Sequence, residues 1–201
     1  MLKLTKIAVT GGIACGKSSV CHIFAELGAY VLSADEIVHQ LLSLNTHVGK
    51  KVVRLLGSDI LEDGFIDRKK VAEKVFSQPN KLKALEAIIH PVIIEEIESQ
   101  YRKIKEKKEI PFFVVEMPLV YESNFANYFD YVLCVVADPR LCSQRFMQKT
   151  NTSQAEYENR MKFQMPLSEK AAKSNFTIVN NGDLTELKKQ VYLLLEELRS
   201  K

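Results

Sequence analysis

The residues with the clearest chemistry lie near the start of the chain, where positions 11 to 18 read Gly-Gly-Ile-Ala-Cys-Gly-Lys-Ser. This spacing is typical of a phosphate-binding loop, because glycines let successive backbone N–H groups face one anion and the next helix begins with its positive end there. In such loops the lysine, here Lys17, reaches the β- and γ-phosphates, and the hydroxyl of Ser18 joins the shell of Mg²⁺. The expected nucleotide-binding residues are Gly12, Ile13, Ala14, Cys15, Gly16, Lys17, Ser18 and Ser19.

Two carboxylates follow short strand-like runs of the sequence. Asp35 comes shortly after Tyr30-Val31-Leu32, and a carboxylate there can accept the proton of an attacking hydroxyl or hold it in line with the γ-phosphate. Asp is also a favoured capping residue, so Asp35 can cap the next helix, and the two roles are compatible. Glu116 follows another run and either contacts Mg²⁺, directly or through water, or is a solvated loop residue.

Basic and amide side chains follow the later runs. Arg145 lies on a helix-like stretch, where its planar guanidinium can bind two oxygens of a transferring phosphoryl group or simply lie at the surface. Asn180 and Asn181 can offer amide groups to an adenine edge, although Asn-Gly also forms ordinary turns. His90 precedes a proline in an apolar helical run, where it is either structural or a hydrogen-bonding partner of a ligand.

The elements that must position these residues alternate along the chain. Continuous apolar runs separated by helical patterns are typical of strands buried on both faces of a parallel sheet. The strand-like runs are 4–10, 30–32, 112–115, 131–136 and 176–179, and the helix-like stretches are 18–27, 35–44, 81–107, 139–149 and 184–198. We therefore predict an α/β fold, with a five-stranded parallel sheet in a three-layer α/β/α core.

The strand-like runs are unevenly spaced, which indicates insertions. The segment between the second and third runs is much longer than one crossover requires. Small phosphotransferases need a substrate-holding insert and a lid that excludes water, because hydrolysis competes with transfer. The sequence thus predicts one kinase-like domain with a core of 1–36, 108–149 and 175–201, a helical substrate-binding insert of 37–107 and a helical lid of 150–174.

The composition is that of a single globular domain of 201 residues, with 26% charged and 46% apolar residues. No apolar run approaches the roughly 20 residues of a membrane span. The net charge of +3 suits an anionic small substrate, and the basic run 102–108 is interleaved with an acid, so neither nucleic acid nor a membrane is an expected partner. Because the first strand-like run begins at once and the cysteines show no CxxC pair, we expect a cytoplasmic protein with reduced thiols.

One cysteine is expected to be reactive. Cys15 lies in the phosphate-binding loop, next to Lys17 and near a helix N-terminus, a setting that lowers the pKa of a thiol. Cys21 lies further along the helix and should be buried and inert. An alkylating reagent should therefore modify Cys15 first, and MgATP should protect it.

The chain resembles the dephospho-coenzyme A kinase family over essentially its whole length. Asp35 matches the second Asp of that family's Asp-Ala-Asp string, which is its catalytic carboxylate. The other matching strings are Thr10-Gly11-Gly12-Ile13, Asp63-Gly64-Phe65-Ile66-Asp67-Arg68, Leu85-Glu86-Ala87-Ile88-Ile89-His90-Pro91, Pro118-Leu119-Val120-Tyr121-Glu122, Gln144-Arg145, Arg160, Gln164-Met165-Pro166-Leu167 and Asn180-Asn181-Gly182.

The resemblance implies transfer of the ATP γ-phosphate to the ribose 3′-hydroxyl of dephospho-coenzyme A, with Mg²⁺. We expect a monomer or small homo-oligomer. The resemblance also implies catalytic roles for Asp35, Lys17 and Arg145, and Mg²⁺ contacts from Ser18 and Glu116. Nucleotide contacts extend from the loop to Asn180 and Asn181. The implied substrate-binding residues are Asp35, His90, Pro118, Leu119, Tyr121 and Gln164.

The chain departs from the family pattern at a few positions. Ser33 replaces the first Asp of the Asp-Ala-Asp string, and Lys149 and Ala171 stand where arginine is frequent, which places more weight on Arg145. Ala14 must adopt the conformation of a loop position that is usually glycine.

Two other functions share parts of this pattern. A different small P-loop kinase, acting on a nucleoside monophosphate or a metabolite hydroxyl, would have the same loop but another insert. A GTP-dependent switch needs Asp-x-x-Gly and Asn-Lys-x-Asp; the sequence has neither, since Asn80-Lys81-Leu82 is followed by Lys83.

Overall fold

The structure is a computed structural model that describes residues 4–76, 78–107 and 109–200. The chain divides into two compact units. The core unit comprises Met1–Leu32 and Ile104–Lys201, and the insert unit comprises Ser33–Lys103.

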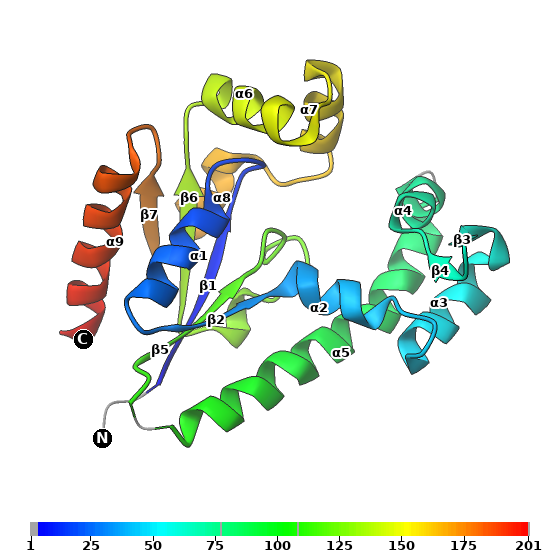
Figure 1. The fold of residues 1–201 in the computed structure, drawn as a ribbon, viewed down its shortest axis with the longest axis horizontal. Helices are drawn as coiled ribbons and strands as arrows, with labels where there is room; N and C mark the ends of the chain where they lie inside the picture. Colours follow the sequence, from blue (N-terminus) through cyan, green and yellow to red (C-terminus); the bar gives the residue numbers. More distant parts are fainter. Residues whose placement is uncertain (1–3, 77, 108, 201) are drawn as a thin grey trace. The chain divides into compact units, whose positions relative to one another are not determined.

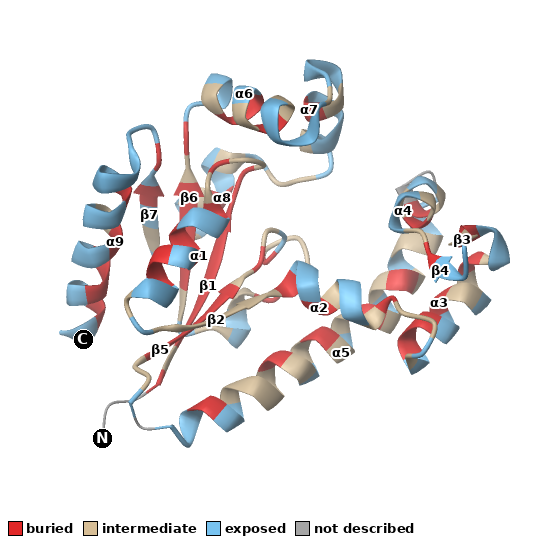
Figure 2. Ribbon diagram, in the orientation of Figure 1, coloured by how far each residue is buried: buried red, intermediate tan, exposed pale blue. Residues whose placement is uncertain are grey.

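The core unit is built on a five-stranded parallel sheet (Figure 1). Its strands are β1 (Thr5–Gly11), β2 (Tyr30–Ser33), β5 (Phe112–Glu116), β6 (Tyr131–Val136) and β7 (Phe176–Val179), in the order β2-β5-β1-β6-β7. The central strands β1, β5 and β6 are buried along most of their lengths (Figure 2), as their unbroken apolar runs predict. All five predicted strands are confirmed.

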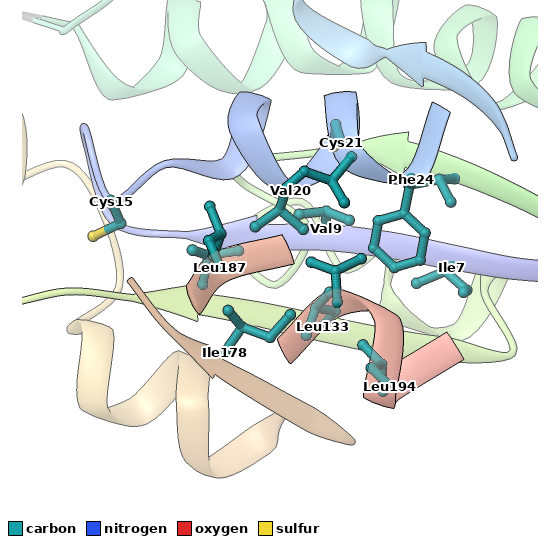
Figure 3. Close-up of a cluster of buried hydrophobic side chains, with 14 of the residues drawn as sticks. Ile7, Val9, Cys15, Val20, Cys21, Phe24, Leu133, Ile178, Leu187 and Leu194 are labelled. Atoms are coloured by element: carbon teal, nitrogen blue, oxygen red, sulfur yellow. The ribbon is translucent and has the colours of Figure 1, made fainter. Parts of the chain in front are cut away.

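Helices flank this sheet. They are α1 (Lys17–Glu26), α6 (Pro139–Thr150), α7 (Gln154–Met161), α8 (Leu167–Lys173) and α9 (Leu184–Arg199), together with the 3₁₀ turn η2 (Ala126–Tyr128). Phe24 of α1 and Leu194 of α9 pack with Ile7 and Leu133 of the sheet in one hydrophobic cluster (Figure 3). The predicted start of α6 is confirmed, because the Asp138 side chain accepts a hydrogen bond from the N–H of Arg140 at 2.7 Å, with proline in the first turn.

The insert unit is mainly helical and carries a small hairpin. Its elements are α2 (Ala34–Leu41), α3 (His47–Leu56), the 3₁₀ turn η1 (Ser58–Ile60), β3 (Leu61–Glu62), β4 (Phe65–Ile66), α4 (Arg68–Phe76) and α5 (Pro79–Lys105). The predicted helices 35–44 and 81–107 are confirmed as α2 and α5, with shifted ends. The hairpin was not predicted; its turn residues Asp63 and Gly64 have φ values of 48° and 81°, as a tight two-residue turn requires.

The start of α2 corrects one sequence interpretation. Ser33, not Asp35, is the N-cap, and its side chain accepts a hydrogen bond from the N–H of Glu36 at 3.3 Å. Asp35 lies in the first turn with an exposed side chain. Ser33 therefore caps α2, which is the structural role that Asp35 could also have filled. Helix capping thus does not explain the carboxylate at position 35.

Within the described ranges, no helix has both the length and the apolar character needed to cross a membrane.

Candidate active site

The phosphate-binding loop connects β1 to α1 in the core unit. Gly11 ends β1 with φ 144°, and Gly16 is the N-cap of α1 with φ 98°, so both lie in the region that favours glycine. A Cβ atom at Gly11 would overlap the carbonyl of Val135, and one at Gly16 would overlap the amide of Asn180. These glycines therefore allow the loop to pass close to the ends of the neighbouring strands.

Ala14 adopts the backbone conformation expected at a loop position that is usually glycine. Its φ is 56°, the left-handed region. For a residue with a Cβ atom this conformation costs roughly 1–2 kcal/mol. The loop therefore keeps its curved shape at this position even without glycine.

Two predicted phosphate and Mg²⁺ residues lie at the start of α1. Lys17 is 9% exposed, and its ammonium donates to the Gly12 carbonyl at 2.8 Å. Ser18 is exposed, and its hydroxyl donates to Glu116 Oε1 at 2.9 Å. The structure thus brings together the two predicted Mg²⁺ contacts from the end of β5 and the start of α1. Among the described residues, no group of three or more His, Cys, Asp or Glu side chains could hold a metal ion.

Asn180 and Arg145 join the loop in one hydrogen-bonded chain. Asn180 is 8% exposed, and its amide nitrogen donates to the Cys15 carbonyl at 2.9 Å. Arg145 donates from Nη1 to the Asn180 carbonyl at 3.1 Å. The amide of Asn180 therefore supports the loop, which is a different use from the adenine contact expected of it. The neighbouring Asn181 is exposed, and its Oδ1 accepts a hydrogen bond from the N–H of Asp138 at 2.7 Å.

Cys15, which the sequence analysis expects to be reactive, is buried in the structure. Its side chain is only 1% exposed, and Sγ lies 3.1 Å from Cys142 Sγ (Figure 3 shows Cys15 in the cluster). The Cys142 thiol hydrogen bond lowers the pKa of Cys15 to about 7, with help from Lys17 and against the effect of burial. Cys21 is also buried, and burial raises the pKa of its thiol, as its predicted inertness requires. All four cysteines are free thiols.

The predicted substrate-binding residues of the core unit gather around the segment 118–122, which we call the acceptor segment. Leu119 is 41% exposed, whereas the Tyr121 hydroxyl lies 2.9 Å from Ser174 Oγ, and burial raises the pKa of Tyr121. Gln164 lies between α7 and α8 and has a buried amide oxygen. The Pro118 carbonyl accepts hydrogen bonds from Thr10 at 3.0 Å and from Lys170 at 2.7 Å.

The remaining two predicted site residues belong to the insert unit. Asp35 is exposed at the start of α2. His90 is partly buried on α5, where burial lowers the pKa of the imidazole and Glu86 acts in the opposite direction.

Sequence reasoning missed Thr10 and Lys170. Lys170 has no exposed surface, yet it occurs in the string Ser168-Glu169-Lys170-Ala171, which reads as an ordinary solvated helix. Only the packing of α8 against β1 and β6 reveals that it is buried.

A parallel sheet, a phosphate-binding loop between its central strand and a helix, and helical additions define this chain as a P-loop kinase by fold and site. The sequence profile of the dephospho-CoA kinase family matches residues 5–186. The chain belongs to this family and is therefore an ATP-dependent kinase.

Individual relatives agree with this assignment. The dephospho-CoA kinase of Protochlamydia amoebophila is 49% identical over 200 residues, covering 99% of this chain and 98% of that relative. A crystal structure of TT1252 from Thermus thermophilus has a TM-score of 0.84 at 29% identity, covering 97% of this chain and 98% of that one. The dephospho-CoA kinase from Campylobacter jejuni has a TM-score of 0.70 at 29% identity and covers 97% of both chains.

Proposed function

We propose that this chain transfers the γ-phosphate of ATP to the ribose 3′-hydroxyl of 3′-dephospho-coenzyme A, giving coenzyme A and ADP. The observation that supports this most strongly is the loop geometry, in which Lys17 and Ser18 begin a helix directly after a glycine-rich turn, in a chain of this family. Phosphoryl transfer depends mainly on positioning and charge stabilisation, which such a loop supplies.

Residues of the core unit bind the phosphates of ATP and hold the phosphate-binding loop in place. The backbone N–H groups of the loop bind the phosphates, and Lys17 moves from the Gly12 carbonyl to the β- and γ-phosphates. Arg145 neutralises charge on the transferring group with its guanidinium, while Asn180 holds the loop carbonyl of Cys15. Asn181 lies at the nucleotide end.

Residues of the insert and of the acceptor segment bind the substrate that carries the hydroxyl to be phosphorylated. Asp35 orients the 3′-hydroxyl or takes its proton, a role consistent with an exposed carboxylate that does not cap its helix. Pro118, Leu119, Tyr121 and Gln164 contact the coenzyme part, together with His90 of the insert. In this proposal residues 37–107 form the coenzyme-binding insert and 150–174 the lid.

Mg²⁺ fits the donors at this site. Ser18 and Glu116 present neighbouring hard oxygen atoms, and Mg²⁺ needs few protein ligands because water and phosphates fill the rest of its shell. When bound, Mg²⁺ would offset negative charge on the phosphates.

The cellular setting follows the sequence expectations. We propose a cytoplasmic enzyme with a small-molecule acceptor, acting as a monomer or small homo-oligomer without nucleic-acid or membrane partners.

An ADP-release assay with separate acceptors tests the proposal. Dephospho-coenzyme A should support turnover, while AMP, pantothenate and shikimate should not. Fast ADP release with AMP and none with dephospho-coenzyme A would favour the alternative, a different small P-loop kinase.

A further inference from the structure

A buried lysine joins the lid to the core, and none of the roles assigned above uses it. Lys170 on α8 is completely buried. Its ammonium donates to the Pro118 carbonyl at 2.7 Å and lies 2.8 Å from Glu122 Oε1. Because a buried charge is costly unless it is paired, these two contacts fix where the acceptor segment lies against α8.

The same carboxylate oxygen also holds the part of the predicted lid that precedes α8. The N–H of Met165 donates to Glu122 Oε1 at 2.8 Å, and Met165 directly follows Gln164. One oxygen of Glu122 therefore receives a cation from α8 and a backbone donor from the segment before it. This shared acceptor links the acceptor segment to two parts of the lid, α8 and the segment before it, within the core unit.

The contact at Pro118 is shared in a different way. Thr10, which precedes Gly11 of the phosphate-binding loop, donates its hydroxyl to the same Pro118 carbonyl at 3.0 Å. If Lys170 lost its charge, Thr10 would still hold Pro118 beside β1, whereas Glu122 would lose its cation. Loss of the Lys170 charge should therefore disturb the acceptor segment and the lid residues before α8 more than the phosphate-binding loop.

Two buried oxygen atoms near the Lys170–Glu122 ion pair could accept further hydrogen bonds. Within the described part of the chain, Glu122 Oε2 and Gln164 Oε1 are buried without a hydrogen-bond partner. Buried acceptors of this kind normally receive a hydrogen bond, from the protein or from a bound molecule. The N–H and O–H groups of an acceptor substrate would meet this need.

We propose that Lys170 and Glu122 are positioning residues for the acceptor substrate. Their ion pair fixes the acceptor segment and Gln164 in the arrangement that receives dephospho-coenzyme A, without touching the reacting atoms. The proposal rests on the function proposed above, in which the acceptor segment contacts the coenzyme part.

Steady-state kinetics of K170M, E122Q, the double variant K170M/E122Q and the control K173M test this role. Lys173 is on the same helix and forms an exposed ion pair with Glu169 at 2.9 Å. K173M should therefore leave the kinetic constants for both substrates unchanged. For K170M, kcat/KM for dephospho-coenzyme A should fall at least about tenfold, since small misplacements of positioning groups are costly. The KM for ATP should change less than about threefold, because Thr10 still holds Pro118. The double variant should recover part of the kcat/KM for dephospho-coenzyme A that K170M loses, because it leaves no unpaired buried charge.

The outcomes separate this proposal from others. Wild-type acceptor kinetics in folded K170M, or equal losses toward ATP and acceptor, would overturn it. If K170M does not fold, E122Q decides. Its side chain keeps an oxygen for both donors but loses the charge that pairs with Lys170, so kcat/KM for dephospho-coenzyme A should fall while the KM for ATP stays nearly normal. Normal acceptor kinetics or a lost fold in E122Q would overturn the positioning role. Absence of dephospho-coenzyme A turnover in the wild-type enzyme would instead refute the proposed function.

Discussion

Replacing Gly16 by alanine should damage the phosphate-binding loop much more than the same change at Gly28. Both glycines have positive φ, 98° and 89°. Alanine in that region costs about 1–2 kcal/mol at either position. At Gly28 an added Cβ meets nothing within 4 Å, whereas at Gly16 it overlaps the amide of Asn180. Gly28→Ala is therefore a control with matched backbone strain and no collision.

The extra cost at Gly16 comes from the hydrogen bond that the collision breaks. The Asn180 amide must move away from the Cys15 carbonyl, a buried contact of 2.9 Å. A buried polar group left without its partner costs about 1–3 kcal/mol. Together with the strain, Gly16→Ala should lower the free energy of unfolding by about 2–5 kcal/mol, against about 1–2 kcal/mol for Gly28→Ala.

Urea unfolding and titration with a fluorescent ATP analogue measure both consequences. Gly16→Ala should also raise the Kd for the analogue at least about tenfold, the equivalent of about 1.4 kcal/mol, because the displaced loop turns its N–H groups away from the phosphates. Gly28→Ala should bind it normally. Equal stabilities for the two variants, together with an unchanged Kd for Gly16→Ala, would show that Asn180 does not constrain the loop.

Four other substitutions or treatments probe the remaining roles. Asp35→Asn should lower kcat by roughly 10²–10⁴-fold with nearly normal ATP binding, and a kcat within about threefold of wild type would remove Asp35 from the chemistry. Ser18→Ala should raise the Mg²⁺ concentration needed for half-maximal activity, and an unchanged Mg²⁺ titration argues against a metal contact. Arg145→Lys should lose at least about tenfold in kcat, because lysine lacks the fork that binds two oxygens; full activity would make Arg145 a purely structural support of Asn180. Iodoacetamide should label the protein slowly because the thiols are buried, but Cys15 should react first, with a rate that rises as pH increases through about 7, where its thiolate forms. Peptide mapping that finds Cys134 labelled first, despite a pKa raised to about 11, contradicts this order.

The parallel sheet and the phosphate-binding loop could be predicted because both depend on local sequence. The run from Ile7 to Thr10 is apolar and β-branched, and the string that follows has the glycines, lysine and serine at the spacing of a phosphate-binding loop. The position of α6 was similarly marked by Asp138 and Pro139, which favour a helix start regardless of the surroundings.

Features that depend on contacts between distant segments could not be predicted. The burial of Cys15 against Cys142 and the support that Asn180 gives the loop each join residues more than a hundred positions apart. The Ser33 cap was missed for a different reason, since serine and aspartate both favour that position and the sequence offers both. The Asp63-Gly64 turn was visible in the sequence, but it was read only as part of a family string.

Identification of the phosphorylated position tests the central claim most directly. Wild-type enzyme, ATP and dephospho-coenzyme A should yield one new phosphomonoester, which ³¹P NMR should place on the ribose 3′ carbon, with ADP formed in equal amount. An analogue of dephospho-coenzyme A that lacks the 3′-hydroxyl should yield neither product. Phosphate at another position, or ADP release that continues unchanged with the 3′-deoxy analogue, would contradict the account.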